Sequence, residues 1–452
     1  MEIDKTLLIG RRLLLDELPY DKEQLEKEPG VTISQTMAIK DGVRRCLRCL
    51  RCGNTELVEL RGGETVVNYC PACIMLGRVA SVDVFYGCNP NFSMQKKVKD
   101  ALTWSGKLSV DQARVSERII ETIEQGSSIL IHAVTGAGKT EMLFKGIELA
   151  LAKGYKIGIA SPRVDVCIEL FPRIQAAFSA IEVSLLYGKQ DEPYFYSQLV
   201  VLTCHQLFRF YRAFDVLIID EVDAFPYLNN EELNYASENA LKKNGTVIYL
   251  SATPPKPLQA KVRRGELDGI TLPKRYHGYT LPVPQVKFIR KWQFNLQQGK
   301  LDKTLKNILT QKENQKRQVL IFCPIVMILK KIVSLTRQVF PNVIQGFSYA
   351  SDEDRISKVQ MMREEEYRWF FTTTILERGV TFPCVDVIVV GADHIVFNTH
   401  SLIQIAGRAG RSIRDPFGDV YFLAEGRSRA MYHAKKEIKK MNRLAKQGEV
   451  LR

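Results

Sequence analysis

The sequence contains no run of apolar residues that approaches the roughly 20 needed for a membrane-spanning helix. Its first residues carry acids where a secretory signal would be basic, and Gly10, Arg11 and Arg12 interrupt their apolar stretch. Internal repeats and low-complexity segments are also absent from the sequence. These absences argue against a secreted or membrane-spanning protein, and we expect an intracellular one. In a reducing compartment, clustered cysteines indicate metal ligands rather than disulfides.

Size and charge set the broad class of protein. The chain has 452 residues, 45% of them hydrophobic, which is enough for two or three domains with their own cores. Its formal net charge of +14 suits a polyanionic partner. Charge alone would equally suit a membrane surface, so the motifs must decide.

Residues 131–142, IHAVTGAGKTEM, are typical of a strand, a tight turn and the start of a helix. The segment fits the phosphate-loop pattern G-x-x-x-x-G-K-[ST], with Ala133 in the place of the first glycine. Its backbone N–H groups would point at phosphate oxygens, its lysine would reach the β- and γ-phosphates, and its threonine would hold Mg²⁺. The expected nucleotide contacts are Thr135, Gly136, Ala137, Gly138, Lys139 and Thr140.

Two later strands are predicted to end in polar residues beside this loop. Residues 214–225, FDVLIIDEVDAF, form a buried strand followed by Asp220, which would orient Mg²⁺, and Glu221, which would polarise the attacking water. Residues 247–255, VIYLSATPP, form a second strand whose Ser-Ala-Thr ending places two hydroxyls near the same row of strand ends.

Residues 404–411, QIAGRAGR, supply positive charge. Gln404, Arg408 and Arg411 are three or four positions apart, so we expect them to share one helix face, where the two guanidiniums would clamp a phosphate. Gly407 and Gly410 weaken a helix unless something approaches closely, which argues against a merely solvated face.

These four blocks, in this order, resemble the superfamily 2 helicases and translocases. The resemblance covers roughly residues 105–425 and implies an α/β fold of two RecA-like domains, each a doubly wound parallel sheet, that sandwich ATP. It implies that the phosphate loop and the Asp-Glu pair lie in the first domain. The second domain would supply Gln404 and the arginine fingers Arg408 and Arg411.

Lesser blocks extend the resemblance. Gln112 stands where the family recognises adenine, and Gly379 stands in the block that links ATP to the nucleic acid. The family often has an acid two residues after that glycine, whereas this chain has Thr381, so a ribose contact there is not implied. The nucleic-acid contacts implied by the resemblance are Pro162, Arg163, Thr203, His205 and Thr373.

Six of the ten cysteines fall between residues 46 and 88. The strings CLRCGN and YCPAC give two C-x-x-C knuckles, which together offer a tetrahedral zinc site. Cys46 forms an overlapping knuckle with Cys49, but Gly53 favours the pair Cys49 and Cys52, leaving Cys46 and Cys88 as spares. An iron–sulfur cluster would use the same ligands, and reduced structural cysteines are the remaining alternative. The predicted zinc ligands are Cys49, Cys52, Cys70 and Cys73.

The remaining segments complete the expected domain organisation. Trp104 lies in a basic segment before the motor, where it could stack on a base or simply dock the segment. Residues 427–447 space apolar residues at helical intervals, which predicts an amphipathic helix packed on the second domain. We expect a lead at 1–40, the Cys₄ module at 41–90, RecA-like domains at 91–278 and 279–426, and a basic helix at 427–452.

The knuckles placed before the motor, together with DEVDAFP, TTTILERGVTFP and QIAGRAGR, resemble the ComFA family of competence DNA-uptake ATPases. That resemblance implies an ATP-, Mg²⁺- and Zn²⁺-dependent translocase of single-stranded DNA in natural transformation. It would act at the inner face of the cell membrane with the uptake channel and companion competence proteins. The resemblance leaves open whether it does so as a homo-oligomer. The alternatives are a replication-restart DNA helicase, an RNA helicase, and a zinc-containing nucleic-acid-binding adaptor with weak ATPase activity.

Overall fold

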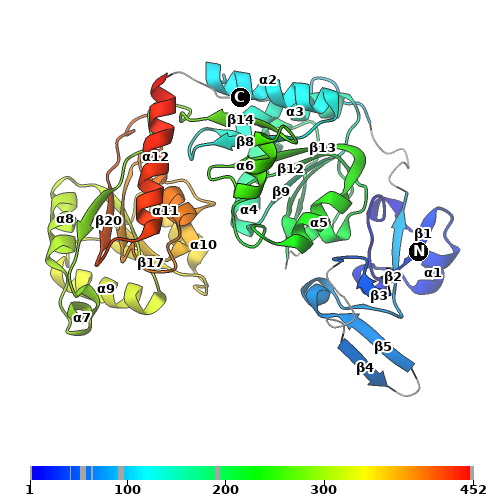
Figure 1. The fold of residues 1–452 in the computed structure, drawn as a ribbon, viewed down its shortest axis with the longest axis horizontal. Coiled ribbons are helices and arrows are strands. Elements are labelled where there is room, and N and C mark those ends of the chain that lie inside the picture. Colours follow the sequence, from blue (N-terminus) through cyan, green and yellow to red (C-terminus); the bar gives the residue numbers. More distant parts are fainter. Residues whose placement is uncertain are drawn as a thin grey trace. The chain divides into compact units, whose positions relative to one another are not determined.

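The computed structural model describes residues 3–40, 42–50, 58–62, 65–89, 96–188 and 194–447. The chain divides into two compact units (Figure 1). The first comprises Met1–Ile131 and Thr140–Ile270, and the second comprises His132–Lys139 and Thr271–Arg452. The division after residue 270 falls a few residues before the domain boundary expected between residues 278 and 279.

A seven-stranded sheet forms the centre of the first RecA-like domain, in the order β10-β11-β9-β12-β13-β8-β14. The pairs β10–β11, β11–β9, β9–β12 and β12–β13 are all parallel. Strands β8, β9, β11 and β12 are buried almost throughout, as expected for a parallel sheet with helices on both faces. Their bounds are Ile129–Ala133 (β8), Ile157–Ser161 (β9), Ser184–Leu186 (β10), Leu199–Thr203 (β11), Phe214–Ile219 (β12), Leu241–Ser251 (β13) and Asp268–Leu272 (β14).

Helices connect these strands, as a doubly wound sheet requires. Ser109 caps the first of them in a capping box with Gln112, and Gly126, at φ +65°, ends it. The helices are α2 (Val110–Gln125), α3 (Lys139–Ala152), α4 (Val164–Ala177), the 3₁₀ turn η4 (Cys204–Arg209), α5 (Glu231–Ala240) and α6 (Lys256–Arg263).

The N-terminal region folds as small antiparallel pairs. Strand β1 (Val31–Gln35) pairs with β7 (Val84–Cys88), so the expected boundary at residue 40 falls inside one structure. The other elements are η1 (Lys5–Leu7), η2 (Leu15–Glu17), α1 (Lys22–Lys27), β2 (Met37–Lys40), β3 (Val43–Cys46), β4 (Val58–Gly62), β5 (Thr65–Cys70), η3 (Pro71–Leu76) and β6 (Val79–Ala80).

The N-terminal segment also pairs with the first RecA-like domain, within the same compact unit. The Arg12 N–H donates to the Arg209 carbonyl at 2.9 Å, and the Tyr211 N–H donates to the Gly10 carbonyl at 2.9 Å. The Arg11 guanidinium lies 4.2 Å from the Tyr194 ring centroid, and burial lowers the pKa of Arg11 to about 10. Through these contacts, the N-terminal segment forms part of the first RecA-like domain.

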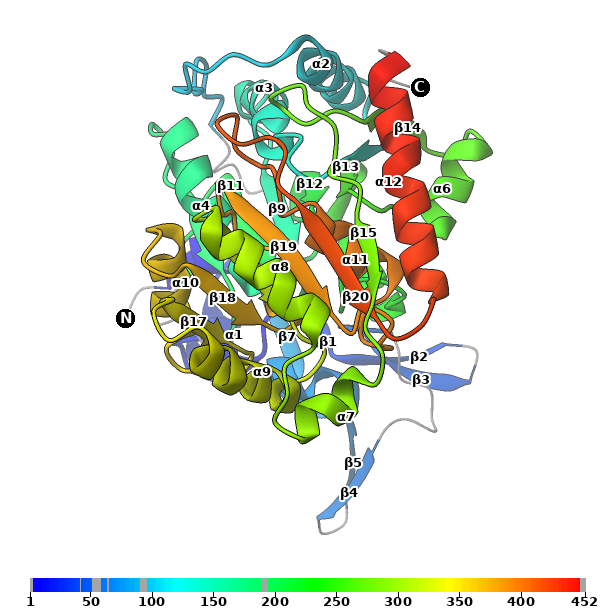
Figure 2. The ribbon, with the colours of Figure 1, turned by 90° about the vertical axis from the view of Figure 1, so that its left-hand side faces the viewer.

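Six strands of the second unit pair in parallel throughout, in the order β15-β20-β19-β16-β18-β17. Helices α8 and α9 cover one face, where their apolar residues join those of β16, β18 and β19 in one core (Figure 2). The strands are β15 (Gln285–Phe288), β16 (Gln318–Phe322), β17 (Gln345–Ser348), β18 (Trp369–Thr372), β19 (Val385–Val390) and β20 (Val420–Ala424). The helices are α7 (Trp292–Gln297), α8 (Lys303–Asn314), α9 (Val326–Val339), α10 (Arg355–Arg363), η5 (Thr374–Glu377), α11 (Thr399–Ala406) and α12 (Arg429–Gln447).

The C-terminal helix agrees with its sequence pattern. Five residues of α12 are buried, and they are the five apolar residues at helical spacing: Met431, Ala434, Ile438, Met441 and Ala445. The lysines on the other face remain in solvent, as expected for a helix packed on one side. Within the described part of the chain, no helix combines the length and the apolar character needed to cross a membrane.

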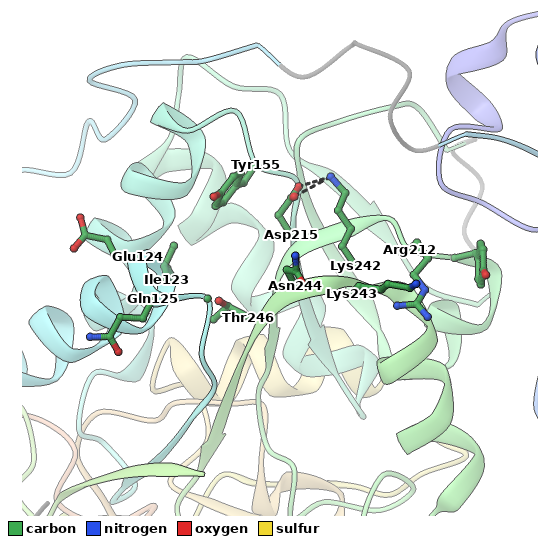
Figure 3. A pocket seen from close by; sticks show the side chains of 12 residues that line it. Ile123, Glu124, Gln125, Tyr155, Arg212, Asp215, Lys242, Lys243, Asn244 and Thr246 are labelled. Carbon is green, nitrogen blue, oxygen red and sulfur yellow. Dashed lines mark hydrogen bonds and ion pairs between the residues drawn. The ribbon is translucent and has the colours of Figure 1, made fainter. Parts of the chain in front are cut away.

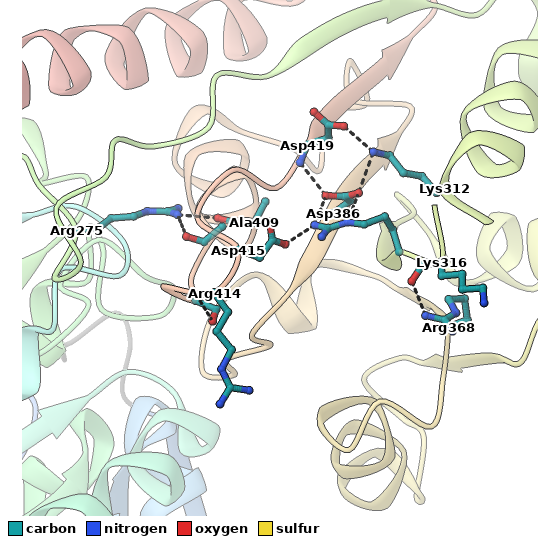
Figure 4. Close-up of polar contacts among 12 residues, drawn as sticks. Arg275, Lys312, Lys316, Arg368, Asp386, Ala409, Arg414, Asp415 and Asp419 are labelled. Atoms are coloured by element: carbon teal, nitrogen blue, oxygen red, sulfur yellow. Dashed lines mark hydrogen bonds and ion pairs between the residues drawn. The ribbon is translucent and has the colours of Figure 1, made fainter. Parts of the chain in front are cut away.

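A buried ionic network lies at the amino-terminal edge of the second sheet (Figure 4). Lys312 Nζ contacts Asp386 at 2.9 Å and Asp419 at 2.6 Å, and Arg317 contacts Asp386 at 2.9 Å and also Asp415. Burial would raise the pKa of Asp386, but hydrogen bonds from Arg317 and Lys312 outweigh it and leave that pKa lowered. The network ties α8 to β19 and to the chain before β20.

Asp386→Asn should lower the free energy of unfolding of the second unit by about 2–4 kcal/mol at neutral pH, because the buried Lys312 and the partly exposed Arg317 lose a shared carboxylate. A lowered pKa means that this stabilisation is complete above the ordinary aspartate value and is lost as the pH falls through the folded value. The difference between wild type and variant should therefore shrink below about pH 4. Urea unfolding followed by fluorescence of the buried Trp292 and Trp369 measures it.

Asp354→Asn is the matched control in the same unit. Its carboxylate is 76% exposed and lies 3.7 Å from Lys358, so the change should cost less than about 0.5 kcal/mol. Equal effects of the two substitutions would show that the network does not stabilise the unit.

Candidate nucleotide site and cysteine cluster

The predicted site residues of the first sheet follow strands that end at one edge. Parallel neighbours are about 4.8 Å apart, so residues after their carboxyl ends form a row. In sheet order, the row begins with Thr203, the last residue of β11, and His205 just after that strand. It continues with Pro162 and Arg163 after β9. Asp220 follows β12, Ser251 ends β13, and β8 comes next with the phosphate loop. The predicted nucleic-acid and nucleotide residues thus occupy separate halves of the row.

The phosphate loop has the backbone geometry that its sequence pattern requires. Gly136 has φ +78° and Gly138 has φ +71°, a left-handed conformation that residues with a side chain rarely adopt. Lys139 is the first residue of the 14-residue helix α3, and Thr140 is buried beside it. A loop that opens onto a helix amino terminus favours an anion there.

The Asp-Glu pair also has an unusual backbone. Asp220 Oδ1 accepts from the Glu221 N–H at 2.9 Å, which holds the two acids in a fixed relation. Glu221 has φ +56°, a conformation that costs a residue with a side chain about 1 kcal/mol or more. Strain of this kind concentrates at functional sites, so it supports the interpretation of Glu221 as a catalytic candidate.

Sequence reasoning missed Asp223, the fourth residue of DEVD. Its carboxylate is buried and accepts hydrogen bonds from Ser251 Oγ at 2.6 Å and Thr253 Oγ1 at 2.5 Å. The two hydroxyls of Ser-Ala-Thr therefore bind the acidic loop rather than face a ligand. The available signal was an acid three residues after Asp220 and a pair of hydroxyls after the neighbouring strand.

Gln112 and Trp104 have structural contacts of their own. Gln112 Oε1 accepts from the Ser109 N–H at 2.9 Å in the cap of α2, so an adenine contact by Gln112 stays a prediction. The Trp104 ring packs edge-on against Phe144, with centroids 5.3 Å apart, which favours the docking interpretation over base stacking.

In the second unit, the block after β18 contacts the arginine segment. Glu377 is buried and accepts from Ser401 Oγ, while Arg408 Nε donates to the Glu377 carbonyl at 3.1 Å. Gly379 has φ +71°, and Thr373 precedes η5. Two residues after that glycine, Thr381 Oγ1 accepts from Arg411 Nη1 at 3.0 Å.

The expectation that Gln404, Arg408 and Arg411 share one helix face is wrong. Helix α11 ends at Ala406, so Gln404 lies on the helix whereas both arginines lie in the turn that follows. The reason is the pair of glycines, which end the helix and allow close approach. A Cβ at Gly407 would be 1.9 Å from Thr135 Oγ1, and one at Gly410, where φ is +64°, would be 2.4 Å from the Pro416 carbonyl oxygen.

A cluster of four buried cysteines lies in the N-terminal module: Cys46, Cys49, Cys70 and Cys73. Their Sγ atoms all lie within 4.8 Å of one another, with 3.8 Å between Cys46 and Cys73 and 3.5 Å between Cys49 and Cys70. Zn–S bonds of ~2.3 Å in a tetrahedron place sulfurs about 3.8 Å apart, so the donor set fits zinc. Hydrogen bonding among the thiols, then burial, raises the pKa of Cys46 and Cys73, so thiolates at these two positions require a cation beside them.

This cluster differs from the ligand set expected from the sequence. The sequence predicted Cys46 to be a spare, but it belongs to the cluster. Cys46 is the last residue of β3, which places it in the cluster before the chain turns to Cys49. Cys52, the ligand expected in its place, lies outside the described residues. Cys88 packs instead with Ile3 and Leu8 in a separate apolar core.

One ionic bridge joins this cluster to the first RecA-like domain. Arg48, which lies between Cys46 and Cys49, donates to Glu17 at 2.5 Å, and Arg209 of η4 donates to the other oxygen of Glu17 at 2.7 Å. Burial would raise the pKa of Glu17, but Arg48 and Arg209 outweigh it and lower that pKa. The cysteine cluster is thus linked to the 3₁₀ turn that carries His205.

A pocket of about 760 Å³ opens at the opposite, amino-terminal edge of the first sheet (Figure 3). Lys242 Nζ is paired with both Asp215 oxygens, at 2.8 and 2.9 Å, on its wall. None of the predicted site residues lines it. Its lining is Ile123, Glu124, Gln125, Gly126, Tyr155, Tyr211, Arg212, Asp215, Lys242, Lys243, Asn244 and Thr246.

Comparison with known families and structures defines the class. The DEAD/DEAH box helicase family matches residues 113–260, and the helicase conserved C-terminal domain matches residues 299–412. The structure of S. cerevisiae Dbp5 bound to RNA and ADP BeF3 is similar in fold, with a TM-score of 0.55 at 14% identity over 74% of this chain and 92% of that one. Two helicase-type parallel-sheet domains indicate an ATPase of superfamily 2.

The whole chain then identifies the family. The competence protein ComFA N-terminal domain matches residues 2–87. Competence protein ComFA is 40% identical in Bacillus subtilis (strain 168), over 98% of this chain and 96% of that protein, and 40% identical in Streptococcus pneumoniae (strain ATCC BAA-255 / R6), over 97% and 98%. The chain belongs to the ComFA family. Replication restart protein PriA of B. subtilis is a more distant relative, 27% identical over 39% of this chain and 24% of that protein.

We predict about one zinc ion per chain, held by Cys46, Cys49, Cys70 and Cys73. Elemental analysis of the purified protein should show that Cys46→Ala loses the metal, because it removes one of four converging thiols. Cys88→Ala is the matched control and should retain it. Zinc retained by Cys46→Ala but lost in Cys52→Ala would restore the ligand set expected from the sequence.

Proposed function

We propose that this chain is an ATP-dependent translocase of single-stranded DNA that powers DNA uptake into the cytoplasm during natural transformation. The observation that carries the proposal is the row of strand ends in the first sheet. The residues that we assign to the nucleotide follow β8 and β12, and they share one sheet edge with the residues that we assign to the nucleic acid, at the ends of β9 and β11. A change at one half of such a row can be transmitted to the other through neighbouring strands.

In the proposed reaction, the phosphate loop binds the triphosphate and Lys139 contacts its β- and γ-phosphates. Bound Mg²⁺, held by Thr140 and Asp220, would neutralise phosphate charge. Glu221 accepts a proton from the attacking water. Asp223, through its hydrogen bonds to Ser251 and Thr253, keeps the acidic loop in place.

The second unit would contribute the positive charge that hydrolysis requires. Arg408 and Arg411 act as arginine fingers on the γ-phosphate, and Gln404 contributes from α11. In the structure, Arg411 donates to Thr381 and Arg408 donates to the Glu377 carbonyl. The block that carries Thr373 and Gly379 therefore responds when the arginines engage phosphate.

The nucleic-acid contacts would grip the sugar–phosphate backbone rather than bases. Arg163 directly precedes α4, Thr203 directly precedes η4, and His205 lies in the first turn of η4, at the half of the row away from the nucleotide. The net charge of +14 adds a long-range attraction for DNA. Thr373 would contribute from the second unit, and Pro162 would shape the turn beside Arg163.

We further propose that zinc in the Cys₄ cluster keeps the N-terminal module folded. Through Glu17 and Arg209, the module then supports the turn that carries His205. The remaining surface of the module is available to the competence uptake machinery, at the cytoplasmic face of the membrane. Membership of the ComFA family supports this placement.

Glu221→Gln should lower kcat for ATP hydrolysis at least about 100-fold while nucleotide affinity changes little, because the amide cannot accept the proton. Lys139→Ala should lower both kcat and nucleotide affinity, since Lys139 supplies positive charge to the phosphates. Steady-state phosphate release and direct binding of a fluorescent ATP analogue separate the two effects. Glu124→Gln, an exposed change on α2, should behave as wild type, and rapid hydrolysis by a folded Glu221→Gln protein would contradict the assignment of the base.

The ATPase rate, measured without nucleic acid and with single-stranded DNA, blunt duplex DNA or RNA, tests the substrate. We expect marked stimulation by single-stranded DNA, little dependence on base sequence, and a steep loss of affinity with salt. Equal stimulation by duplex would favour a restart-type helicase. Stimulation by RNA alone would favour an RNA helicase and contradict the proposed function.

A further inference from the structure

Arg275 is a buried cation that no motif identified. It lies in the segment that follows β14 and is 2% exposed. Its Nη1 donates to the Ala409 carbonyl at 2.8 Å and also to the Gly410 carbonyl, and its Nη2 donates to the Gly407 carbonyl at 3.2 Å (Figure 4 shows the contact with Ala409). Three carbonyls of one turn therefore converge on one guanidinium.

Burying a guanidinium without a carboxylate partner costs free energy of folding, so stability alone does not explain this arrangement. Among the described residues, no carboxylate lies within ion-pair distance of Arg275, so backbone dipoles provide its compensation. Burial, and then the charge of Arg411, lower the pKa of Arg275 to about 9. A buried arginine with carbonyl partners alone contrasts with Lys312 and Arg317, whose partners are carboxylates.

The three carbonyls belong to the turn that carries both predicted arginine fingers. Because α11 ends at Ala406, its last carbonyls have no partner within the helix, and Arg275 satisfies those of the turn beyond it. The Gly407 carbonyl accepts from Arg275 and also from Arg411 Nε, at 3.1 Å. The position of the Arg411 side chain is thus coupled to Arg275 through one shared acceptor.

The residues that follow Arg275 make further contacts within the second compact unit, both with the phosphate loop and with the turn at residues 407–411. The Tyr276 N–H donates to the Gly136 carbonyl of the phosphate loop at 3.0 Å. His277 Nε2 lies 3.2 Å from the Gly410 carbonyl oxygen. The Tyr279 ring packs against Phe417, which follows the turn that carries Arg408 and Arg411, with ring centroids 5.1 Å apart.

We propose that Arg275 is a positioning residue for ATP hydrolysis, which holds the turn of Arg408 and Arg411 in its active conformation beside the phosphate loop. The role rests on the proposed ATPase function and goes beyond its assigned residues. A guanidinium suits it because a planar fork can serve three carbonyls at once, whereas a lysine ammonium is a point donor.

The test compares Arg275→Ala and Arg275→Lys with wild type in kcat, KM and direct binding of a fluorescent ATP analogue. We expect Arg275→Ala to lower kcat about 10–100-fold with nucleotide affinity within about 3-fold, because misplacing a catalytic group by about 1 Å can cost about 100-fold in rate. Arg275→Lys should recover part of the loss. Arg264→Ala, which removes an exposed arginine paired with Glu266, is the control and should match wild type.

Hydrogen exchange of residues 407–411 without nucleotide separates this role from the proposed function. Arg275→Ala should exchange faster there than wild type, even in a preparation whose thermal midpoint is unchanged. If Arg275→Ala exchanged faster but the wild type had no ATPase activity, the proposed function would be refuted, whereas the contact between Arg275 and the turn would stand. A kcat within about 2-fold of wild type, or a loss of affinity that equals the loss of rate, would overturn the positioning role.

Discussion

Parallel strand pairing is the constraint on which the rest of the structure depends. When neighbouring strands run in the same direction, whatever follows each of them falls at one edge of the sheet, however far apart the segments are in sequence. Residues after β11, β9 and β12 are brought into a row in this way. In the second sheet, the same rule places the block after β18 at the carboxyl edge, opposite the edge that holds the network around Asp386.

The parts that the sequence predicted correctly depend on local physics. The two parallel-sheet domains, the tight turn at Gly136 and Gly138, and the apolar stripe of α12 all follow from spacing and residue type within short segments. The glycines of the finger segment were correctly expected to allow close approach. The domains of helicase type and the ComFA family were likewise recognisable from the order of motifs.

The parts that the sequence did not predict depend on contacts between distant segments. Choosing between two overlapping knuckles required knowing where β3 ends relative to η3, which spacing alone does not contain. Asp223 acquires its role from hydroxyls 28 and 30 residues away, and Arg275 from carbonyls at least 132 residues away. The end of α11 was misjudged because helical spacing continues through Arg408 and Arg411, although the intervening glycines stop the helix.

Residues 8–13 lie between two partners that are synthesised much later. Leu13 exchanges backbone hydrogen bonds with Tyr86, while Gly10 and Arg12 bond to Tyr211 and Arg209. Contacts of such long sequence separation form late in folding, because a long loop must close before they contribute. Residues 8–13 are therefore synthesised before their partners and are among the last to reach their final place. Until residue 211 has emerged, this segment has only the β7 side of its binding site.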